Sequence, residues 1–471
     1  MLVTIKKFGP IDECCYDLSK DLIAIYGENN IGKSYSMQLL YLLIKALLNT
    51  DNYRFVNNYR FINLRTYSSD DKSMRKLIEQ IDEFKKSSLS SQDISETVHS
   101  LVNDFLFALI GETFFRSFKN TFSSCDASAS DDSFIQYKSD DFYIKCFLKT
   151  HKIIVGGDLS KVNLIEATSY YHKSRQTKNG LSIYVVKKEG NNELPIQAII
   201  EVVFEKVNKI LRLLFNEFSN VYFLPASRSG IYNGMTAFAP IVAELAKNKS
   251  FFTRKLEFPG LTEPISDYFI TLSSFRNMTN EKYKDIYEMI ENDILKGKVT
   301  YDRKENILLY VSDANEIKFK MTEVSSMVSE IAPIVAYLKF IINDKMRYSY
   351  LRAQKSKPII FIEEPEAHLH PKNQVKLAKA FTDLVNNDVR LIISSHSNYI
   401  FNKFNNLILN GELDFKKYQP VVIVKENSTS KSFDMEIDEL GVVDKNFSDT
   451  SYDLLQEREE IIEKLNSENS D

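Results

Sequence analysis

Residues 359–371 read IIFIEEPEAHLHP, and this stretch decides the fold. Its first four residues are apolar and mostly β-branched, which predicts a short strand buried on both faces. Glu363 and Glu364 follow at the carboxyl end of that strand, where open α/β sheets bind their ligands. Two adjacent carboxylates repel each other unless a cation or a proton compensates their negative charge. The stretch therefore predicts a site for a magnesium ion that carries a nucleotide.

A second motif lies near the N-terminus, where the apolar run 22–26 leads into GENNIGKS at residues 27–34. This is the GxxxxGK[ST] pattern of a phosphate-binding loop, and residues 37–48 have the apolar spacing of the helix that follows such a loop. The loop turns its N–H groups toward phosphates, the lysine adds a positive charge, and the serine hydroxyl can ligate magnesium. A plain glycine turn with an exposed lysine is the alternative. The predicted nucleotide-binding residues here are Gly27, Asn29, Asn30, Gly32, Lys33, Ser34 and Tyr35.

Two further apolar runs end in residues that can serve the same site. Residues 221–224 lead to Arg228, which can contact a phosphate or a carboxylate or can equally hold a loop in place. Residues 391–393 lead to SSHS, whose His396 can donate a hydrogen bond to a γ-phosphate. The sequence leaves both roles of Arg228 open.

The segment 323–330 reads EVSSMVSE and precedes the apolar helical run 331–342. Small hydroxyl residues that open a helix can leave N–H groups free for an anion. An ordinary serine N-cap explains the same residues, and spacing alone favours that interpretation.

The rest of the chain predicts several structural regions. Apolar residues at helical spacing predict helices over 74–84 and 94–122, and short alternating runs from residue 134 predict an antiparallel sheet. A mostly helical lobe is expected over 235–300. The predicted domains are a nucleotide-binding head over 1–50 and 134–425, a helical insertion over 51–133, and a C-terminal extension over 426–471 with a short charged helix.

Composition bounds the class of protein. With 44% hydrophobic and 26% charged residues, a globular chain with a sizeable core is expected. The formal net charge is -4, so a nucleic-acid interface would need a local patch such as the basic and tyrosine-bearing segment 345–357, for which a polar helix end is the favoured interpretation. No apolar run approaches the about 18 residues of a membrane span, which predicts a cytoplasmic protein without a membrane partner. The four cysteines lack CxxC spacing, which argues against a zinc site.

Taken in chain order, GENNIGKS, VSSMVSE, IIFIEEPEAHLHP and SSHS resemble the motifs of ABC-type ATPases related to the SMC, RecF and OLD proteins. The resemblance covers residue 1 to about residue 408, with 51–133 as an insertion typical of the family. EEPEAHLHP is its most specific part and points to the OLD-like branch. The resemblance implies an α/β P-loop NTPase of the ABC/SMC-like head type, with a mixed sheet core, an antiparallel β subdomain and a helical insertion and lobe.

The resemblance also implies residue roles. Ser34 and Glu363 would hold Mg²⁺, Glu364 would be the base that positions the attacking water, and His396 would sense the γ-phosphate of ATP. Ser326 would complete the nucleotide site of the opposite subunit. Arg228 lies where the Q-loop is expected, although no glutamine is present there.

Two residues depart from the family pattern. Glu363 replaces the usual aspartate, and its longer side chain must still fit the octahedral shell of the metal. Met327 replaces the signature glycine, which is expected to weaken phosphate contact across a dimer and slow hydrolysis.

The implied function is an ATPase that acts as a head-to-head homodimer clamped by ATP. Only about 60 residues follow the last core strand, too few for a TOPRIM domain, so a separate effector such as a TOPRIM or HNH nuclease is expected, as in two-gene anti-phage systems. One alternative is a RecF-like ATPase that binds DNA in repair or recombination. Another is a scaffold that binds ATP with little turnover.

Overall fold

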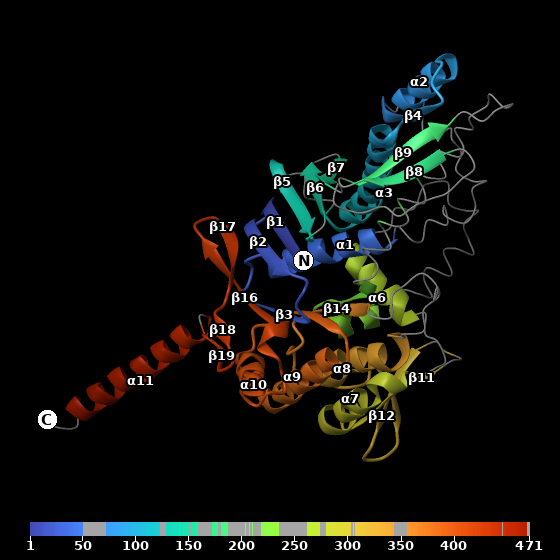
Figure 1. Ribbon diagram of the computed structural model, residues 1–471. Helices are drawn as coiled ribbons and strands as arrows, with labels where there is room; N and C mark the ends of the chain where they lie inside the picture. The colour runs from blue at the N-terminus through green and yellow to red at the C-terminus, as the bar shows by residue number, and fades with distance from the viewer. Residues whose placement is uncertain are drawn as a thin grey trace, which may run out of the picture. The chain divides into compact units, whose positions relative to one another are not determined.

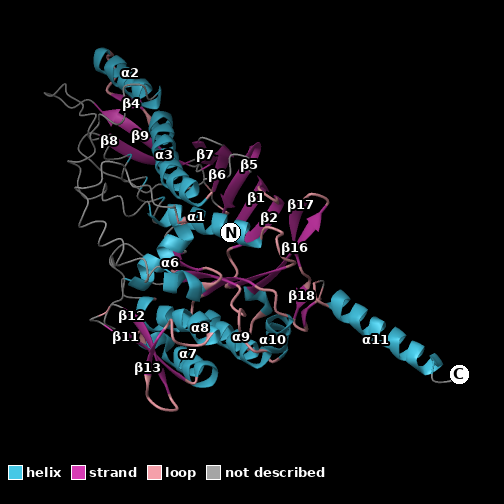
Figure 2. Ribbon diagram, turned by 180° about the vertical axis from the view of Figure 1, so that it is seen from behind, coloured by secondary structure: helices cyan, strands magenta, loops and turns pink. Residues whose placement is uncertain are grey.

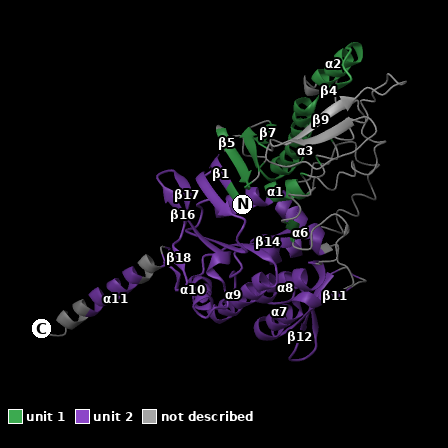
Figure 3. Cartoon of the chain, in the orientation of Figure 1, with its two compact units in different colours: residues 1–3, 42–220, 347–356 green, residues 4–41, 221–346, 357–471 purple. Residues whose placement is uncertain are grey.

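The computed structural model folds into two compact units, which Figure 3 shows in different colours. One unit comprises residues 1–3, 42–220 and 347–356, and the other comprises residues 4–41, 221–346 and 357–471. All of the predicted site residues belong to the second unit. The structure describes residues 1–49, 72–122, 129–140, 142–149, 152–158, 172–177, 180–186, 203, 207, 210, 218–234, 261–273, 279–302, 305, 307–342, 356–444 and 446–468.

The centre of the second unit is a mixed sheet, as the sequence predicted. The strands that this unit contributes lie in the order β10-β14-β15-β3-β16-β17-β2-β1. Strand β3 pairs in parallel with both β15 and β16, and β14 pairs in parallel with β15, so three strand ends that precede predicted site residues meet at one edge. The strands are β1 Leu2–Phe8, β2 Ile11–Asp17, β3 Leu22–Tyr26, β10 Phe218–Leu224, β14 Lys357–Glu363, β15 Arg390–Ser394, β16 Tyr418–Glu426 and β17 Thr429–Asp434.

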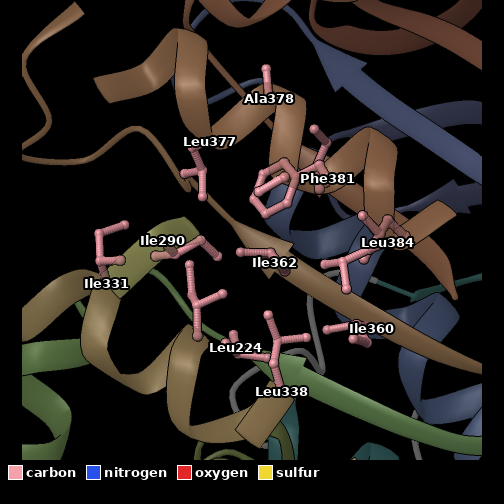
Figure 4. Packing of buried hydrophobic residues seen from close by; sticks show 14 of the residues in the cluster. Leu224, Ile290, Ile331, Leu338, Ile360, Ile362, Leu377, Ala378, Phe381 and Leu384 are labelled. Carbon is pink, nitrogen blue, oxygen red and sulfur yellow. The ribbon is translucent and has the colours of Figure 1, made fainter. Parts of the chain in front are cut away.

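Strand β14 is buried on both faces, which confirms the prediction from its continuous apolar run. Ile360 and Ile362 pack against the helices on one face, where Figure 4 shows them close to Phe381 and Leu384. On the other face the ring of Phe361 lies 5.7 Å from that of Tyr41 and 5.9 Å from that of Phe223, measured between centroids. A strand without a polar face needs cover on both faces, and β14 has it in its place between β10 and β15.

Helices α8, α9 and α10 lie on one side of β3 and β14 (Figures 1 and 2). Helix α9 begins at Pro371, as predicted, and His370 caps it by accepting a hydrogen bond from the Lys372 N–H at 3.2 Å. Proline suits this first position because its missing N–H would have no helical partner there. The helices are α8 Ser326–Ala336, α9 Pro371–Asn386 and α10 Asn398–Leu409, with single turns η6 Tyr337–Ile341 and η7 Phe415–Lys417.

The described residues of the predicted lobe, 261–273 and 279–300, are mostly helical. The lobe is closed by a three-stranded antiparallel sheet in the order β11-β12-β13, in which Tyr310 of β12 faces Phe319 of β13 in register. The lobe consists of α6 Glu263–Ser273, η4 Glu281–Tyr283, α7 Lys284–Met289, η5 Ile290–Leu295, β11 Gly297–Asp302, β12 Ile307–Ser312 and β13 Lys318–Lys320.

The first unit contains the predicted helices and the predicted antiparallel strands. Gly111 lets α3 approach β7, because a Cβ atom at this glycine would lie 3.2 Å from Cγ2 of Val155. The short strand β4 between the two helices pairs with β9, which sequence periodicity did not predict. The elements are α1 Lys33–Asn49, whose last turns lie in this unit, α2 Lys72–Lys86, β4 Ser91–Asp93, α3 Ser95–Thr121, β5 Ala129–Lys138, β6 Tyr143–Lys149, β7 Lys152–Asp158, β8 His172–Thr177 and β9 Gly180–Val186.

Helix α3 is the described helix to compare with the expectation that no segment is apolar enough to span a membrane. By length and mean hydropathy alone it reaches the threshold of a membrane span, although no apolar run of that length was expected. Val98, Leu101 and Phe114 on this helix are buried within the protein. Buried core helices of soluble proteins meet the same criteria, so the helix by itself is weak evidence for a membrane.

The chain closes with a strand pair and a helix. Strands β18 Ile437–Asp438 and β19 Gly441–Val442 pair with each other, and helix α11 spans Ser448–Glu468. The sequence predicted a charged helix in this region, and the helix observed is longer than the predicted one.

Candidate nucleotide-binding site

The loop between β3 and α1 has the backbone geometry of a phosphate-binding loop. Gly27 has a φ of +130°, and a Cβ atom there would lie 2.4 Å from the carbonyl oxygen of Ile423. Gly32 has a φ of +98°, and a Cβ atom there would lie 3.0 Å from Cγ of Pro10. Both positions therefore need glycine, for conformation and for space. The strand, loop and helix follow one another as the sequence predicted.

The ammonium group of Lys33 lies folded over this loop. Lys33 is only 7% exposed, and its Nζ donates hydrogen bonds to the carbonyl oxygens of Gly27, at 3.0 Å, and of Glu28. Burial lowers the pKa of Lys33 to about 8, against the opposing effect of the nearby Glu364 and Glu366 carboxylates. Phosphate oxygens are stronger acceptors than these carbonyls, and they would restore the charge of the lysine.

This depressed pKa predicts that nucleotide affinity depends on pH. Only protonated Lys33 attracts phosphate, so we expect the Kd of a non-hydrolysable ATP analogue to rise about tenfold between pH 7 and pH 9. Isothermal titration calorimetry at several pH values would measure it. Lys33→Arg is the matched control, because arginine stays protonated throughout this range. The Kd of this variant should change little between pH 7 and pH 9. The same loss of affinity in both proteins would contradict the assignment of the pH effect to Lys33.

The remaining predicted loop residues are accessible to a ligand. Asn29, Asn30 and Ser34 are exposed, and Asn30 has a φ of +61°. The Tyr35 side chain is 39% exposed. Sequence reasoning missed Ser36, whose buried hydroxyl accepts a 2.6 Å hydrogen bond from the Tyr16 hydroxyl and donates one of 2.8 Å to the Lys33 carbonyl.

Strand register brings the predicted motifs together. Glu363 on β14 is aligned with Ser394 on β15, and Ser394 is aligned with Ile25 on β3. The alignment continues past the strands, because the Glu364 N–H donates to the Ser394 carbonyl and the Ser395 N–H donates to the Ile25 carbonyl, both at 3.0 Å. The glutamate pair, the SSHS segment and the phosphate loop therefore leave the sheet side by side.

Glu363 has the environment of a metal ligand. Its side chain is buried, Oε2 accepts a 3.2 Å hydrogen bond from the Ala226 N–H, and Oε1 has no hydrogen-bond partner within the described part of the chain. Burial raises the pKa of Glu363, and the neighbouring Ser34 hydroxyl partly offsets this by lowering it. A buried carboxylate oxygen without a partner is costly, and it is the hard donor that Mg²⁺ prefers.

The donor set around Glu363 fits magnesium better than a metal held by protein alone. The described residues contain no group of three or more His, Cys, Asp and Glu side chains placed to hold a metal ion. Mg²⁺ in nucleotide sites is held by one or two protein oxygens, with phosphates and water completing its shell. Glu363 and Ser34 would supply those protein oxygens.

Glu364 occupies a strained backbone conformation. Its φ is +43°, which is uncommon for a residue other than glycine. Residues in such conformations persist where the surrounding structure holds them in place, and they cluster at functional sites. The half-buried Glu364 side chain lies close enough to Lys33 and His396 to affect the pKa of each.

His396 is held by a residue that sequence reasoning missed. The backbone N–H of His396 donates to Oε1 of Glu366, whose Oε2 has no hydrogen-bond partner among the described residues. Burial, and then the charge of Lys33, lower the pKa of His396, so the imidazole is neutral at pH 7. Burial raises the pKa of Glu366. The signal for Glu366 was its place two residues after the glutamate pair.

Arg228 was predicted either to bind nucleotide or to hold a loop, and its observed partners are all within the protein. Its side chain is 0% exposed, and its guanidinium group donates to backbone carbonyls of Pro225, Glu330, Glu363 and Glu364. A phosphate would have to displace these partners in the core. The structure therefore favours the other predicted role, in which the arginine holds a loop.

Ser326 lies exposed in the first turn of α8. Ser325 is the N-cap of this helix and accepts a hydrogen bond from the Val328 N–H, so the N-cap interpretation holds for Ser325. No hydrogen bond or ion pair in the described part of the chain joins Ser326 to the phosphate loop or to the glutamate pair.

One comparison with known proteins shows the family of the chain. The family model of the AAA ATPase domain matches residues 1–401. No curated protein matches the chain. The SMC head domain from Thermotoga maritima is similar at 10% identity and a TM-score of 0.35, over 93% of this chain and 98% of that chain. The Smc head domain bound to the C-terminal domain of ScpA derived from Pyrococcus furiosus is similar at 10% identity and a TM-score of 0.36, over 97% and 98%.

Proposed function

Because the chain belongs to the family of AAA ATPase domains, we propose that it binds ATP with Mg²⁺ and hydrolyses it to ADP and phosphate. The observation that carries this proposal is the strand register that sets Glu363 and Glu364 beside the phosphate loop. A buried carboxylate with a free oxygen, a lysine folded over a glycine loop and a neutral histidine then share one edge of the sheet. These are the groups that phosphoryl transfer to water needs.

Each residue of the site has a defined task in this reaction. Lys33 would leave the loop carbonyls and bind the β- and γ-phosphates, while Ser34 and Glu363 would hold Mg²⁺, which neutralises phosphate charge. Glu364 would orient a water molecule and accept its proton as the water oxygen bonds to the γ-phosphorus and ADP departs with the electrons of the broken P–O bond. Neutral His396 would donate a hydrogen bond to a γ-phosphate oxygen.

Phosphate release from ATP by the purified protein tests this function. We expect Mg²⁺-dependent turnover that EDTA abolishes and added Mg²⁺ restores. The absence of turnover together with tight ATP binding would favour the alternative of a scaffold with little hydrolysis. The absence of both binding and turnover would refute the proposal.

The same site supports a homodimer whose two heads are clamped by ATP. Ser326 is exposed at the N-terminal end of α8, where unpaired N–H groups attract anions, and it makes no bond to the loop of its own chain. The Met327 side chain is partly buried against the core, so at this position it covers apolar surface in place of the usual glycine. A nucleotide-dependent dimer would appear in light scattering with the ATP analogue and vanish with ADP.

We place this ATPase in the OLD-like branch, where it would control a separate effector in anti-phage defence. Helix α11 supports the existence of such a partner. The side chains of Leu454, Leu455, Ile461 and Ile462 are each 46% or more exposed and share one face of this helix at seven-residue spacing. The helix carries seven acidic and two basic residues, so pairing with a second copy would bring like charges together. The occupant we infer is an effector protein with an apolar groove rimmed by Lys and Arg.

Substitutions on α11 test this surface with the protein encoded by the adjacent reading frame as the probe. We expect Leu455→Asp to weaken the complex of the two purified proteins at least about tenfold while ATP turnover is unchanged. Gln456→Asp is the matched control, because it adds the same charge on a different face and should leave binding intact. Calorimetry or biolayer interferometry would give the affinities. Equal affinities in the two variants would exclude this face as the effector surface.

The DNA-binding alternative gains no observation from the structure. The segment that motivates it, 345–357, lies outside the described residues except for its last two positions. The ammonium group of Lys357 lies 2.9 and 3.0 Å from the two carboxylate oxygens of Asp21, so this lysine already has a partner.

A further inference from the structure

Helix α8 carries a buried charge that nucleotide binding does not explain. Glu330 is 1% exposed, and its Oε2 lies 3.3 Å from Nε of Arg228, which is 0% exposed. The same carboxylate accepts hydrogen bonds from the backbone N–H groups of Arg228 and Ser229, both at 3.1 Å, and from the Ser229 hydroxyl at 2.7 Å. This ion pair is therefore fully satisfied, and neither partner can turn to solvent without leaving the other unpaired.

The other edge of the Arg228 guanidinium binds the backbone of Glu363 and Glu364. Nη1 donates to the Glu363 carbonyl at 2.7 Å, and Nη2 donates to the Glu364 carbonyl at 3.2 Å. Nε also donates to the Glu330 carbonyl at 3.0 Å. One planar side chain thus joins the backbone of α8 to the backbone at the end of β14.

These contacts act on the strained residue. Glu364 has a φ of +43°, a conformation that needs support from its surroundings. Its N–H is held by the Ser394 carbonyl at 3.0 Å, and its carbonyl is held by Arg228. Loss of the second contact would free the peptide that follows Glu364 and let its carboxylate drift from the place where it meets water.

We propose that Arg228 and Glu330 are positioning residues that couple α8 to the catalytic carboxylate. Ser326 and Glu330 lie one turn apart on α8, so an anion bound at the start of this helix shifts the Glu330 carboxylate. Arg228 passes that shift to the backbone of Glu363 and Glu364. This inference rests on the proposed function, in which Glu364 handles the attacking water. The arrangement makes hydrolysis depend on where α8 is held.

Hydrogen exchange of the purified protein tests the coupling without any turnover. In Glu330→Gln, which keeps the shape of the side chain, we expect faster amide exchange in the peptide that covers residues 363–369. Glu291→Gln is the matched control, because it breaks another buried ion pair of the same unit, Glu291 with Lys339 at 2.8 Å. Faster exchange in Glu330→Gln alone supports the coupling. Unchanged exchange, or the same change in both variants, overturns it.

Kinetics test the consequence. We expect Glu330→Gln and Arg228→Lys each to lower kcat about tenfold or more with KM and analogue Kd within about threefold, because a small misplacement of a catalytic group is costly. The double variant should lose no more than either single variant, since the pair acts as one unit. Ser229→Ala removes only one hydrogen bond to Glu330 and serves as a milder variant in case the larger changes impair folding. It should lower kcat by a smaller factor. Equal loss in Glu291→Gln, or additive losses, would overturn the positioning role.

The two hypotheses fail differently. If Glu330→Gln exchanges faster than the wild-type protein at residues 363–369 but the wild-type protein shows no turnover, the coupling stands and the assignment of ATP hydrolysis fails. If the wild-type protein turns over ATP and Glu330→Gln matches it in both exchange and kcat, the ATPase assignment stands and the coupling fails.

Discussion

Replacement of Glu364 by glutamine is expected to lower kcat for ATP at least about 100-fold while analogue affinity stays within about threefold of wild type. Glutamine keeps the size and the hydrogen-bonding reach of the side chain but cannot accept the proton of the attacking water. The carboxylate lies beside Lys33 and His396, and its backbone is fixed by Ser394. The substitution therefore removes a step of the chemistry without removing a ligand of the nucleotide.

Single-turnover phosphate release and light scattering would measure the two effects together. Because ATP would persist in the site, the variant should accumulate as an ATP-bound dimer that dissociates slowly. Glu439→Gln is the matched control, because Glu439 is exposed on the turn between β18 and β19. This variant should behave as wild type. Equal turnover in Glu364→Gln and in the wild-type protein would remove Glu364 from the mechanism.

Much of the fold could be predicted because its strands and helices carry strong local signals. The continuous apolar runs of β3, β14 and β15 predict central strands, and each ends in a motif whose chemistry needs that position. The α/β class predicted from these motifs is confirmed by the mixed sheet, and the predicted ATPase family is confirmed at the level of the AAA ATPase domain. Strand β4 was missed because three residues, SQD, have no periodicity, and only pairing with β9 makes them a strand.

The roles at the site were harder to predict than its location. A sequence does not distinguish an arginine that binds phosphate from one that holds a loop. Only the fold shows that the guanidinium group of Arg228 donates to backbone carbonyls. Glu330 resembled a helix-turn residue for the same reason, although it is the buried partner of that arginine. Glu366 was missed since its bond is to a backbone N–H, and backbone groups carry no residue identity. Long-range partners of this kind become visible only in three dimensions.

Glu363→Gln is the second substitution with a large expected effect, and it should act in opposite directions on activity and stability. We expect turnover to fall at least about 100-fold, because an amide is a poor substitute for a carboxylate in holding Mg²⁺. Without nucleotide, however, the variant should be more stable than wild type by about 1 kcal/mol at pH 7. The reason is that the native carboxylate is buried with Oε1 unpartnered.

The pH dependence gives the sign of this effect. The pKa of Glu363 is raised in the folded protein, so its contribution to stability is present below the unfolded value of 4.5 and is lost as pH rises through the folded value. In the wild-type protein this residue should therefore make the nucleotide-free form less stable as pH rises through that window, whereas glutamine has no such dependence.

Urea unfolding with and without Mg²⁺ and the ATP analogue would separate these terms. Magnesium and nucleotide should stabilise the wild-type protein strongly and the glutamine variant weakly, because ligand binding adds stability in proportion to affinity. Glu363→Asp is the matched control, since it restores the usual family residue and keeps the charge. A nucleotide-free Glu363→Gln protein less stable than wild type would show that the carboxylate serves the core. Glu363 would then stabilise the folded protein itself, and the unpartnered Oε1 could not be explained as a cost that metal binding offsets.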